Sequence, residues 1–209
     1  MEKKSLKRAL STADLLKKKY HTLDFTAEWY QAFSTPERYG IWFVWGTSGS
    51  GKSNFVAQLA KQLSRFGKVI YNSLEEADSM TIQRSFAEAG LAETGRRVIL
   101  VSESMDDLSV RLSQPRSPVF AIVDSFQYTR MSYAQYIAFK EKHRHKLIIF
   151  VSHADGKLPA GRSARGVMYD AALKIWVEGY KAFSKGRYIG PNGGIYTIWD
   201  AGAFEYWMR

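Results

Sequence analysis

The sequence predicts an α/β fold, in which a mainly parallel sheet is covered by helices on both faces and extended at one edge by antiparallel strands. From residue 40 onward, runs rich in Ile, Val and aromatic residues alternate with segments of helical periodicity. These runs are mainly apolar, as expected for strands buried on both faces. After residue 178, short segments around glycines indicate the antiparallel strands. The predicted strands are 41–45, 68–72, 97–102, 118–123, 146–151 and 172–177, and the predicted helices are 52–66, 79–89, 105–113 and 132–143.

Length and composition bound the class of protein. The 209 residues fit one sizeable domain. No apolar run reaches the roughly 18 residues of a membrane span, and the N-terminus lacks the apolar region of a signal peptide, so we expect a cytoplasmic protein with no membrane partner. The absence of cysteine excludes disulfides and thiolate metal sites. The net charge of +10 favours a polyanionic partner, although it is also compatible with a general role in solubility.

The N-terminal segment is basic and amphipathic. Its first twenty residues carry seven lysines and arginines against two acids. Helical spacing is shared by Leu6, Leu10, Ala13, Leu16 and Tyr20. We therefore predict a basic helix within an arm at 1–25, followed by one domain at 26–209. The helix either docks on a neighbouring subunit or nucleic acid, or packs on its own domain.

Residues 41–53, IWFVWGTSGSGKS, combine a predicted strand with the phosphate-binding pattern G-x-x-x-x-G-K-[ST]. The glycines allow backbone N–H groups to point at a phosphate, and the following helix adds its positive N-terminus. Lys52 can reach the β- and γ-phosphates, and the Ser53 hydroxyl can bind Mg²⁺. We expect ATP or GTP with Mg²⁺ as cofactors. The predicted contacts are Gly46, Thr47, Ser48, Gly49, Ser50, Gly51, Lys52, Ser53 and Asn54.

Two adjacent acids, Glu75 and Glu76, follow the predicted strand 68–72. They should lie at the sheet edge where the phosphate loop ends, because parallel strands end at one edge. Adjacent carboxylates repel, and the raised proton affinity of one of them suits an acid/base catalyst. Alternatively, both acids begin the helix at 79–89 and interact with its dipole.

Asp124 ends the apolar strand 118–123 and has the position of a Walker B acid, which holds Mg²⁺ beside the phosphates. The alternative is a turn that begins with Asp124 and Ser125. Gln127, Tyr128 and Arg130 follow closely, and the aromatic ring and the cation among them can receive a base and its phosphate.

A basic segment at 153–166, HADGKLPAGRSARG, follows the strand 146–151. We expect a flexible loop in which Lys157, Arg162 and Arg165 track a phosphate backbone. The preceding cluster KEKHRHK lacks paired ligands at a metal spacing, so it reads as a solvated helix end.

Short strands are expected in RYIG, GGIYTIW and AFEYWM at the C-terminal edge of the sheet. Lys185 and Arg187 lie two residues apart, so on a strand they project to the same side. Such a pair can reach across a subunit interface and stabilise charge on a phosphoryl group. Otherwise they are solvated cations on an edge strand.

Several of these motifs together resemble the RecA-like ATPases, and within them the cores of the replicative helicase DnaB and the branch-migration protein RadA. SLEE at 73–76, DSFQ at 124–127 and IIFVSH ending at His153 carry the resemblance in the first part of the domain. The resemblance implies that Glu75 is the catalytic base, with Glu76 in a supporting role only, and that Asp124 is the Walker B acid. It also implies that Ser152 or His153 senses the γ-phosphate.

The resemblance continues through RSARGVMYDAALKIW, which starts at Arg162, and SKGRYIGPNGG at 184–194. It implies that the segment from Arg162 touches single-stranded DNA in a central channel. It further implies that Lys185 and Arg187 reach the γ-phosphate bound by a neighbouring subunit.

Together these patterns predict a Mg²⁺-dependent ATPase that forms a homo-oligomeric ring, such as a hexamer, or a filament, and acts on single-stranded DNA in replication or recombination. A different class remains open, a nucleotide-gated switch or scaffold that binds a protein partner and no DNA. A small-molecule P-loop kinase would need an arginine-bearing lid, for which the glycine-rich stretch RYIGPNGG is poorly suited.

Overall fold

The computed structural model describes residues 9–208. The strands are β1 (Gly40–Gly46), β2 (Val69–Ser73), β3 (Val98–Val101), β4 (Phe120–Asp124), β5 (Leu147–Asp155), β6 (Leu158–Pro159), β7 (Leu173–Glu178), β8 (Lys181–Ser184) and β9 (Ile195–Thr197). The α-helices are α1 (Thr12–Lys17), α2 (Ala27–Phe33), α3 (Lys52–Ser64), α4 (Met80–Glu88), α5 (Met105–Ser113), α6 (Tyr133–Lys142), α7 (Arg162–Asp170) and α8 (Asp200–Trp207). Two 3₁₀ helices are η1 (Leu91–Arg97) and η2 (Phe126–Thr129).

The strands form a mixed sheet in the order β3-β2-β4-β5-β1-β7-β8-β9. Neighbouring strands from β3 to β7 run parallel, whereas β8 and β9 are antiparallel additions at one edge. The short strand β6 pairs with the end of β5. This arrangement confirms the predicted fold class, including the antiparallel C-terminal edge.

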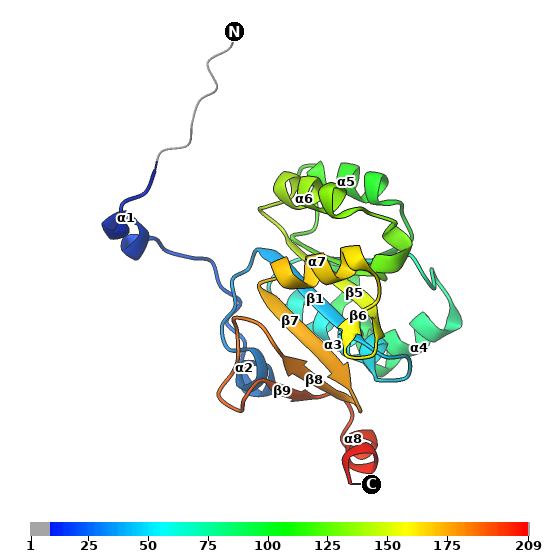
Figure 1. Cartoon of the computed structure of the whole chain (residues 1–209). Helices are drawn as coiled ribbons and strands as arrows, with labels where there is room; N and C mark the ends of the chain where they lie inside the picture. The colour runs from blue at the N-terminus through cyan, green and yellow to red at the C-terminus, as the bar shows by residue number, and fades with distance from the viewer. Residues whose placement is uncertain (1–8, 209) are drawn as a thin grey trace.

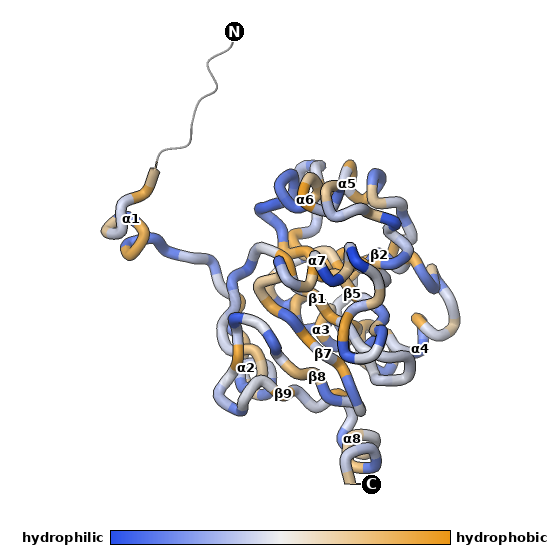
Figure 2. The backbone as a smooth tube through the Cα atoms, in the orientation of Figure 1, coloured by the Kyte–Doolittle hydropathy of each residue, from blue (hydrophilic) through white to orange (hydrophobic). Residues whose placement is uncertain are grey.

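Both faces of the sheet are buried, which explains why the central strands are mainly apolar. On β1, Trp42 and Val44 pack into the core beneath α2 and α3. Ile41, Phe43 and Trp45 point the other way, into the core beneath α5, α6 and α7. Figure 1 shows these helix layers, and Figure 2 shows apolar residues gathered along the central strands. Each fully buried side chain of this size contributes roughly 1.5–3 kcal/mol of hydrophobic free energy.

The C-terminal region differs from the prediction in two elements. The segment GGIYTIW does contain a strand, β9, but RYIG at 187–190 is irregular, and AFEYWM belongs to the helix α8. Aromatic enrichment favours strand in a short window, where periodicity alone cannot separate the two states. The helix turns Gly202 toward Trp199 and Tyr180, and a Cβ on Gly202 would lie 2.1 Å from the Trp199 ring. The close packing of Gly202 on these two rings therefore favours a helix over a strand in this segment.

The basic segment 153–166 is ordered rather than a flexible loop. The strand β5 runs on to Asp155, turns into β6, and leads to α7, which begins at Arg162. Arg165 ties these pieces together, because its Nε donates to the Pro159 carbonyl at 3.1 Å and its guanidinium lies 3.3 Å from Asp155 Oδ2. The prediction of a mobile phosphate-tracking loop was wrong in this respect.

The N-terminal helix is shorter than the predicted 6–20. It spans α1 alone, begins with a capping box between Ser11 and Asp14, and buries none of its residues. Leu6 lies outside the described residues. The chain joins the body at Leu23 and Phe25, which are buried in the core just before the predicted domain start at 26. Figure 1 shows α1 standing apart from the body.

Candidate nucleotide-binding site

The loop between β1 and α3 has the backbone of a phosphate cradle. Gly46 leaves no room for a side chain, since a Cβ there would lie 2.3 Å from the Val177 carbonyl oxygen on the neighbouring strand. Gly51 caps α3 with a φ of 97°, in the left-handed region that glycine adopts without strain. The N-terminus of α3 therefore opens toward the loop, as anion binding requires.

A cavity of about 330 Å³ lies over this loop and gathers residues from five parts of the chain. Of the predicted residues it is lined by Ser48, Gly49, Gly51, Lys52, Ser53, Asn54, Glu75, Asp124, Ser152 and His153. Gly46, Thr47 and Ser50 shape the loop without lining the cavity. Sequence reasoning missed Ser73, Ser125, Val151 and Tyr180, and gave Glu76 only a supporting role.

Lys52 lies at the floor of the cavity. Its Nζ donates to the Thr47 carbonyl of the same loop at 2.7 Å. Burial lowers the pKa of Lys52, and the carboxylates of Asp124 and Glu75 act in the opposite direction. A polyanion in the cavity would offset the cost of burying this ammonium.

Asp124 is held in place by a tyrosine that the sequence did not single out. The Tyr71 hydroxyl, buried in β2, donates to Asp124 Oδ2 at 2.6 Å. Burial raises the pKa of Asp124, whereas the Tyr71 hydrogen bond lowers it. Burial, together with the nearby Asp124 carboxylate, raises the pKa of Tyr71 well above its usual range, so the hydroxyl remains a donor. A divalent cation would favour the ionised carboxylate.

Glu75 and Glu76 have different surroundings. The backbone N–H of Glu75 donates to the Asp124 carbonyl at 3.3 Å, and its Oε2 lies 3.0 Å from His153 Nε2. Glu76 instead accepts hydrogen bonds from Ser79, at 3.2 Å, and from Thr81, at the start of α4. The helix-start alternative therefore applies to Glu76, and Glu75 is the acid that faces the polar end of β5.

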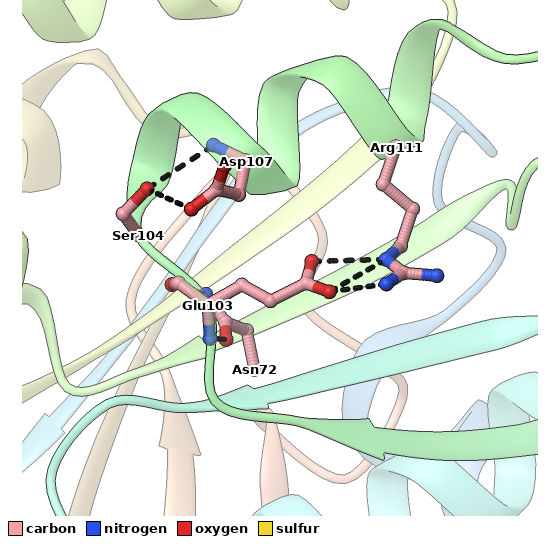
Figure 3. A network of polar contacts seen from close by, with 5 residues as sticks. All are labelled: Asn72, Glu103, Ser104, Asp107 and Arg111. Carbon is pink, nitrogen blue, oxygen red and sulfur yellow. Dashed lines mark hydrogen bonds and ion pairs between the residues drawn. The ribbon is translucent and has the colours of Figure 1, made fainter.

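The strand that precedes Glu75, β2, is also fixed at its other edge, by the network in Figure 3. Asn72 donates to the Glu103 carbonyl at 2.9 Å and accepts from the Glu103 N–H at 2.8 Å. The Glu103 carboxylate accepts from Arg111 Nε at 2.9 Å, and Ser104 caps α5 through Asp107. This polar frame holds β2 and β3 together next to the cavity.

Gln127 connects the end of β5 to the segment that precedes α7. Its Nε2 donates to the Ser152 hydroxyl at 2.8 Å and to the Ala160 carbonyl at 3.0 Å. Its Oε1 accepts from the His153 N–H at 3.3 Å. The side chain is thus fully engaged within the protein, beside the residues that were predicted to sense the γ-phosphate.

The residues present fit a Mg²⁺ nucleotide. The buried hydroxyls of Ser50 and Ser125 have no hydrogen-bond partner within the described part of the chain. Among residues 9–208, no group of three or more His, Cys, Asp or Glu converges as a metal site. Mg²⁺ commonly binds through one or two protein ligands, with phosphates and water completing its shell. Ser53 and Asp124 both line the cavity and carry the oxygen atoms that such an ion would need.

Lys185 and Arg187 do not line this cavity. Both are exposed and lie beyond the end of β8. Their N–H groups donate to the carbonyls of Lys174, at 2.6 Å, and Ala172, at 3.0 Å, so they continue the antiparallel pairing with β7. An exposed position away from the same chain's P-loop is compatible with contact to a neighbouring subunit.

Of the residues predicted to bind nucleic acid, some are exposed to solvent and one is bonded within the protein. Arg130, Lys157 and Arg162 are exposed, whereas Arg165 is tied to β6 as described above. Arg162 and Arg165 line a surface groove with the exposed rings of Tyr133 and Tyr169. We call this surface the basic groove. The tyrosines were missed, although Tyr169 is seven residues from Arg162, a helical spacing that places both on one face of α7.

No helix within residues 9–208 combines the length and the apolar character needed to cross a membrane.

Comparison with known proteins supports the fold. No family model and no curated protein matches the chain. Among solved structures, the flagellar accessory protein FlaH from Methanocaldococcus jannaschii has a TM-score of 0.57 at 15% identity, over 86% of this chain and 92% of that chain. A KaiC-like protein from Pyrococcus horikoshii has a TM-score of 0.55 at 18% identity, over 77% of this chain and 89% of that chain. The chain therefore has a RecA-like fold.

Proposed function

We propose that the protein is a cytoplasmic, Mg²⁺-dependent ATPase that binds single-stranded DNA and works as a ring or filament in replication or recombination. The observation that carries the ATPase part is the meeting of Lys52, Asp124, Glu75 and His153 in one cavity over the phosphate loop. An acid near a bound polyphosphate, oriented by a partner, is the arrangement that water activation needs.

In this proposal each side chain has a separate role. Lys52 stabilises negative charge on the phosphates, and Ser53 and Asp124 hold Mg²⁺, which supplies further charge stabilisation. Glu75 accepts a proton from the attacking water. The 3.0 Å contact from His153 Nε2 orients the Glu75 carboxylate and connects it to the end of β5.

The test of hydrolysis compares Glu75→Gln with Glu76→Gln. Loss of a general base costs about 10²- to 10⁴-fold in rate, so Glu75→Gln should retain Mg²⁺-ATP binding and lose turnover on that scale. Glu76→Gln is the matched control, because its carboxylate is engaged at the start of α4. Equal turnover in the two variants would remove Glu75 from the proposed role.

The nucleic-acid part of the proposal draws on the net charge of +10 and on the basic groove, which two arginines line together with two exposed tyrosine rings. Such surfaces bind a single strand through phosphates and base stacking. Fluorescence anisotropy with a single-stranded oligonucleotide should show affinity that falls as salt rises, with a log–log slope of about −0.7 per phosphate contact. Arg162→Ala should reduce this slope, and an absence of binding at low salt would contradict the DNA assignment.

The oligomer part of the proposal concerns Lys185 and Arg187, which would act on nucleotide held by a neighbouring subunit. An Arg187→Ala protein mixed with a Glu75→Ala protein tests it. The two lesions fall in different halves of a shared site, so mixed assemblies should contain some intact sites and recover part of the activity. Mixtures no more active than either parent would contradict hydrolysis across an interface.

A nucleotide-gated assembly scaffold is the second candidate, favoured by exposed apolar side chains on both terminal helices. These are Leu15 and Leu16 on α1 and Phe204 and Tyr206 on α8. Light scattering with and without ATP, beside the oligonucleotide titration, separates the two functions. Assembly that depends on ATP in a protein with no affinity for DNA would favour the scaffold.

A further inference from the structure

A second cavity, of about 310 Å³, lies between the ends of β1, β7 and β8 and the C-terminal helix α8. It shares no residue with the nucleotide cavity. Its lining residues are Trp45, Lys157, Trp176, Glu178, Phe183, Lys185 and Trp207. We call it the aromatic pocket. Figure 1 shows α8 beside the ends of β7 and β8.

The three indole rings of the aromatic pocket are fixed by their own N–H groups. Trp45 Nε1 donates to the Lys157 carbonyl at 3.1 Å, and Trp176 Nε1 donates to Glu178 Oε2 at 3.0 Å. Trp207 Nε1 donates to the Gly179 carbonyl at 3.0 Å. With every indole donor used inside the protein, the rings offer a ligand only their faces and edges. Rings held in place before binding lose little entropy when a ligand arrives.

The arrangement of the aromatic rings suits a planar ligand. Trp45 and Trp176 are tilted neighbours with centroids 5.7 Å apart, and Phe183 and Trp207 meet edge to face at 5.8 Å. Trp45 and Trp176 are nearly buried, at 5% and 8% exposure, while Trp207 is 42% exposed. The pocket therefore has an aromatic floor and an open aromatic rim.

The charge at the rim is positive. Within residues 9–208, neither Lys157 nor Lys185 forms an ion pair with a carboxylate, and Lys185 Nζ lies 5.9 Å from the Phe183 ring centroid. The one carboxylate in the lining, Glu178, accepts from Trp176 and, at 3.4 Å, from the Tyr206 hydroxyl. The complementary ligand is planar, aromatic and anionic.

We propose that the aromatic pocket binds one nucleotide unit of a single-stranded nucleic acid, with the base on the rings and a phosphate at Lys157. This inference rests on the nucleic-acid binding proposed above and assigns a second contact to the strand. Stacking without hydrogen-bond donors makes recognition tolerant of sequence.

The position of Lys157 supports a strand rather than a free nucleotide. Lys157 stands in the turn between β5 and β6, and five residues later Arg162 begins α7 in the basic groove. The pocket and the groove are thus joined by one short, ordered segment. The pocket also lacks a glycine loop of the kind that cradles the phosphates of a free nucleotide at Gly46–Ser53.

The test uses the full chain and a fluorescent single-stranded oligothymidylate. Trp207→Ala should weaken its binding by about tenfold or more, the usual effect of removing a stacking platform. Phe204→Ala is the matched control, because this ring is 67% exposed on the same helix and does not line the pocket. Lys157→Ala, a surface change that spares the fold, should weaken binding and reduce the salt slope by about 0.7.

The possible outcomes distinguish the proposed role of the aromatic pocket from the more general proposal that the protein binds nucleic acid. Wild-type binding that Trp207→Ala and Lys157→Ala reduce, with Phe204→Ala unchanged, supports the pocket. Wild-type binding that neither pocket variant alters overturns the pocket and leaves nucleic-acid binding intact. An absence of wild-type binding overturns both. A competition experiment in a Lys52→Ala background separates a strand from a free nucleotide. If unlabelled ATP displaces the fluorescent oligonucleotide as effectively as unlabelled oligothymidylate at the same concentration of nucleotide units, the pocket binds free nucleotide and the proposal of a bound strand is overturned.

Discussion

Replacement of Tyr71 by phenylalanine tests how Asp124, the proposed Walker B acid, is held. The Tyr71 hydroxyl is buried and donates to Asp124 Oδ2 at 2.6 Å. The substitution removes this one donor and leaves the ring, which packs edge to face on Phe86 at 5.2 Å. The expected effect is therefore on the Asp124 carboxylate and the Mg²⁺ it is proposed to hold.

The size of the effect follows from the charge of the acceptor. A hydrogen bond to a charged group contributes about 1.5–3 kcal/mol, and each 1.4 kcal/mol is about tenfold in an equilibrium constant. Loss of a partner behind a metal ligand commonly costs about 10- to 100-fold in metal affinity. Tyr71→Phe should raise the Mg²⁺ concentration for half-maximal ATP turnover by about this factor.

The assay is a Mg²⁺ titration of ATP hydrolysis at saturating nucleotide, with Tyr136→Phe as control. Tyr136 is also fully buried, and its hydroxyl donates to the carboxylate of Asp170, on α7 and outside the nucleotide cavity. Tyr136→Phe should lower the melting temperature without moving the Mg²⁺ midpoint. A Mg²⁺ midpoint unchanged in Tyr71→Phe, or moved equally in Tyr136→Phe, would refute the reasoning.

Three further predictions concern other parts of the molecule. Gly46→Ala places a Cβ 2.3 Å from the Val177 carbonyl oxygen, so equilibrium titration should show nucleotide binding weakened by about tenfold or more. Burial lowers the pKa of His143 to about 4, where the ring is bonded to Ser109 Oγ at 2.9 Å. Because the unfolded chain takes up this proton near pH 6.5, urea unfolding should show stability falling by roughly 1–2 kcal/mol between pH 6.5 and 4, and His143→Gln should flatten that profile. Gln127→Ala breaks the link from β5 to the start of α7, so it should reduce stimulation of hydrolysis by an oligonucleotide while ATP binding persists; undiminished stimulation would contradict the link.

The parallel part of the fold was predictable because each strand carries its own signal. A strand buried on both faces is mainly apolar, and the six predicted runs all contain strands. Beyond Glu178 the strands are short and one face is exposed, so aromatic side chains occur in strand and helix alike. The strand expected at AFEYWM is a helix for this reason, and its state is set by the packing of Gly202 against Trp199.

The candidate site was predictable to the same extent. Asp124 and Glu75 stand at strand ends, and parallel strands bring their ends to one edge without any knowledge of register. Tyr71 could not be found this way, since a tyrosine inside an apolar strand resembles any other core residue. The choice between Glu75 and Glu76 also needed coordinates, because two adjacent acids have the same sequence environment and differ only in their partners, His153 and Ser79.

The aromatic pocket shows which kind of site a sequence conceals. Trp45 and Trp176 are directly opposite each other in the register of β1 and β7, although 131 positions separate them in the chain. Lys157, in the turn between β5 and β6, and Lys185, directly after β8, join them in the lining. The ends of parallel strands can be predicted to lie at one edge of the sheet, whereas a pocket between neighbouring strands depends on their register. A slip of one residue would turn either indole to the opposite face of the sheet. Register is fixed by the packing of both faces together, so sites of this kind become visible only once the whole core is assembled.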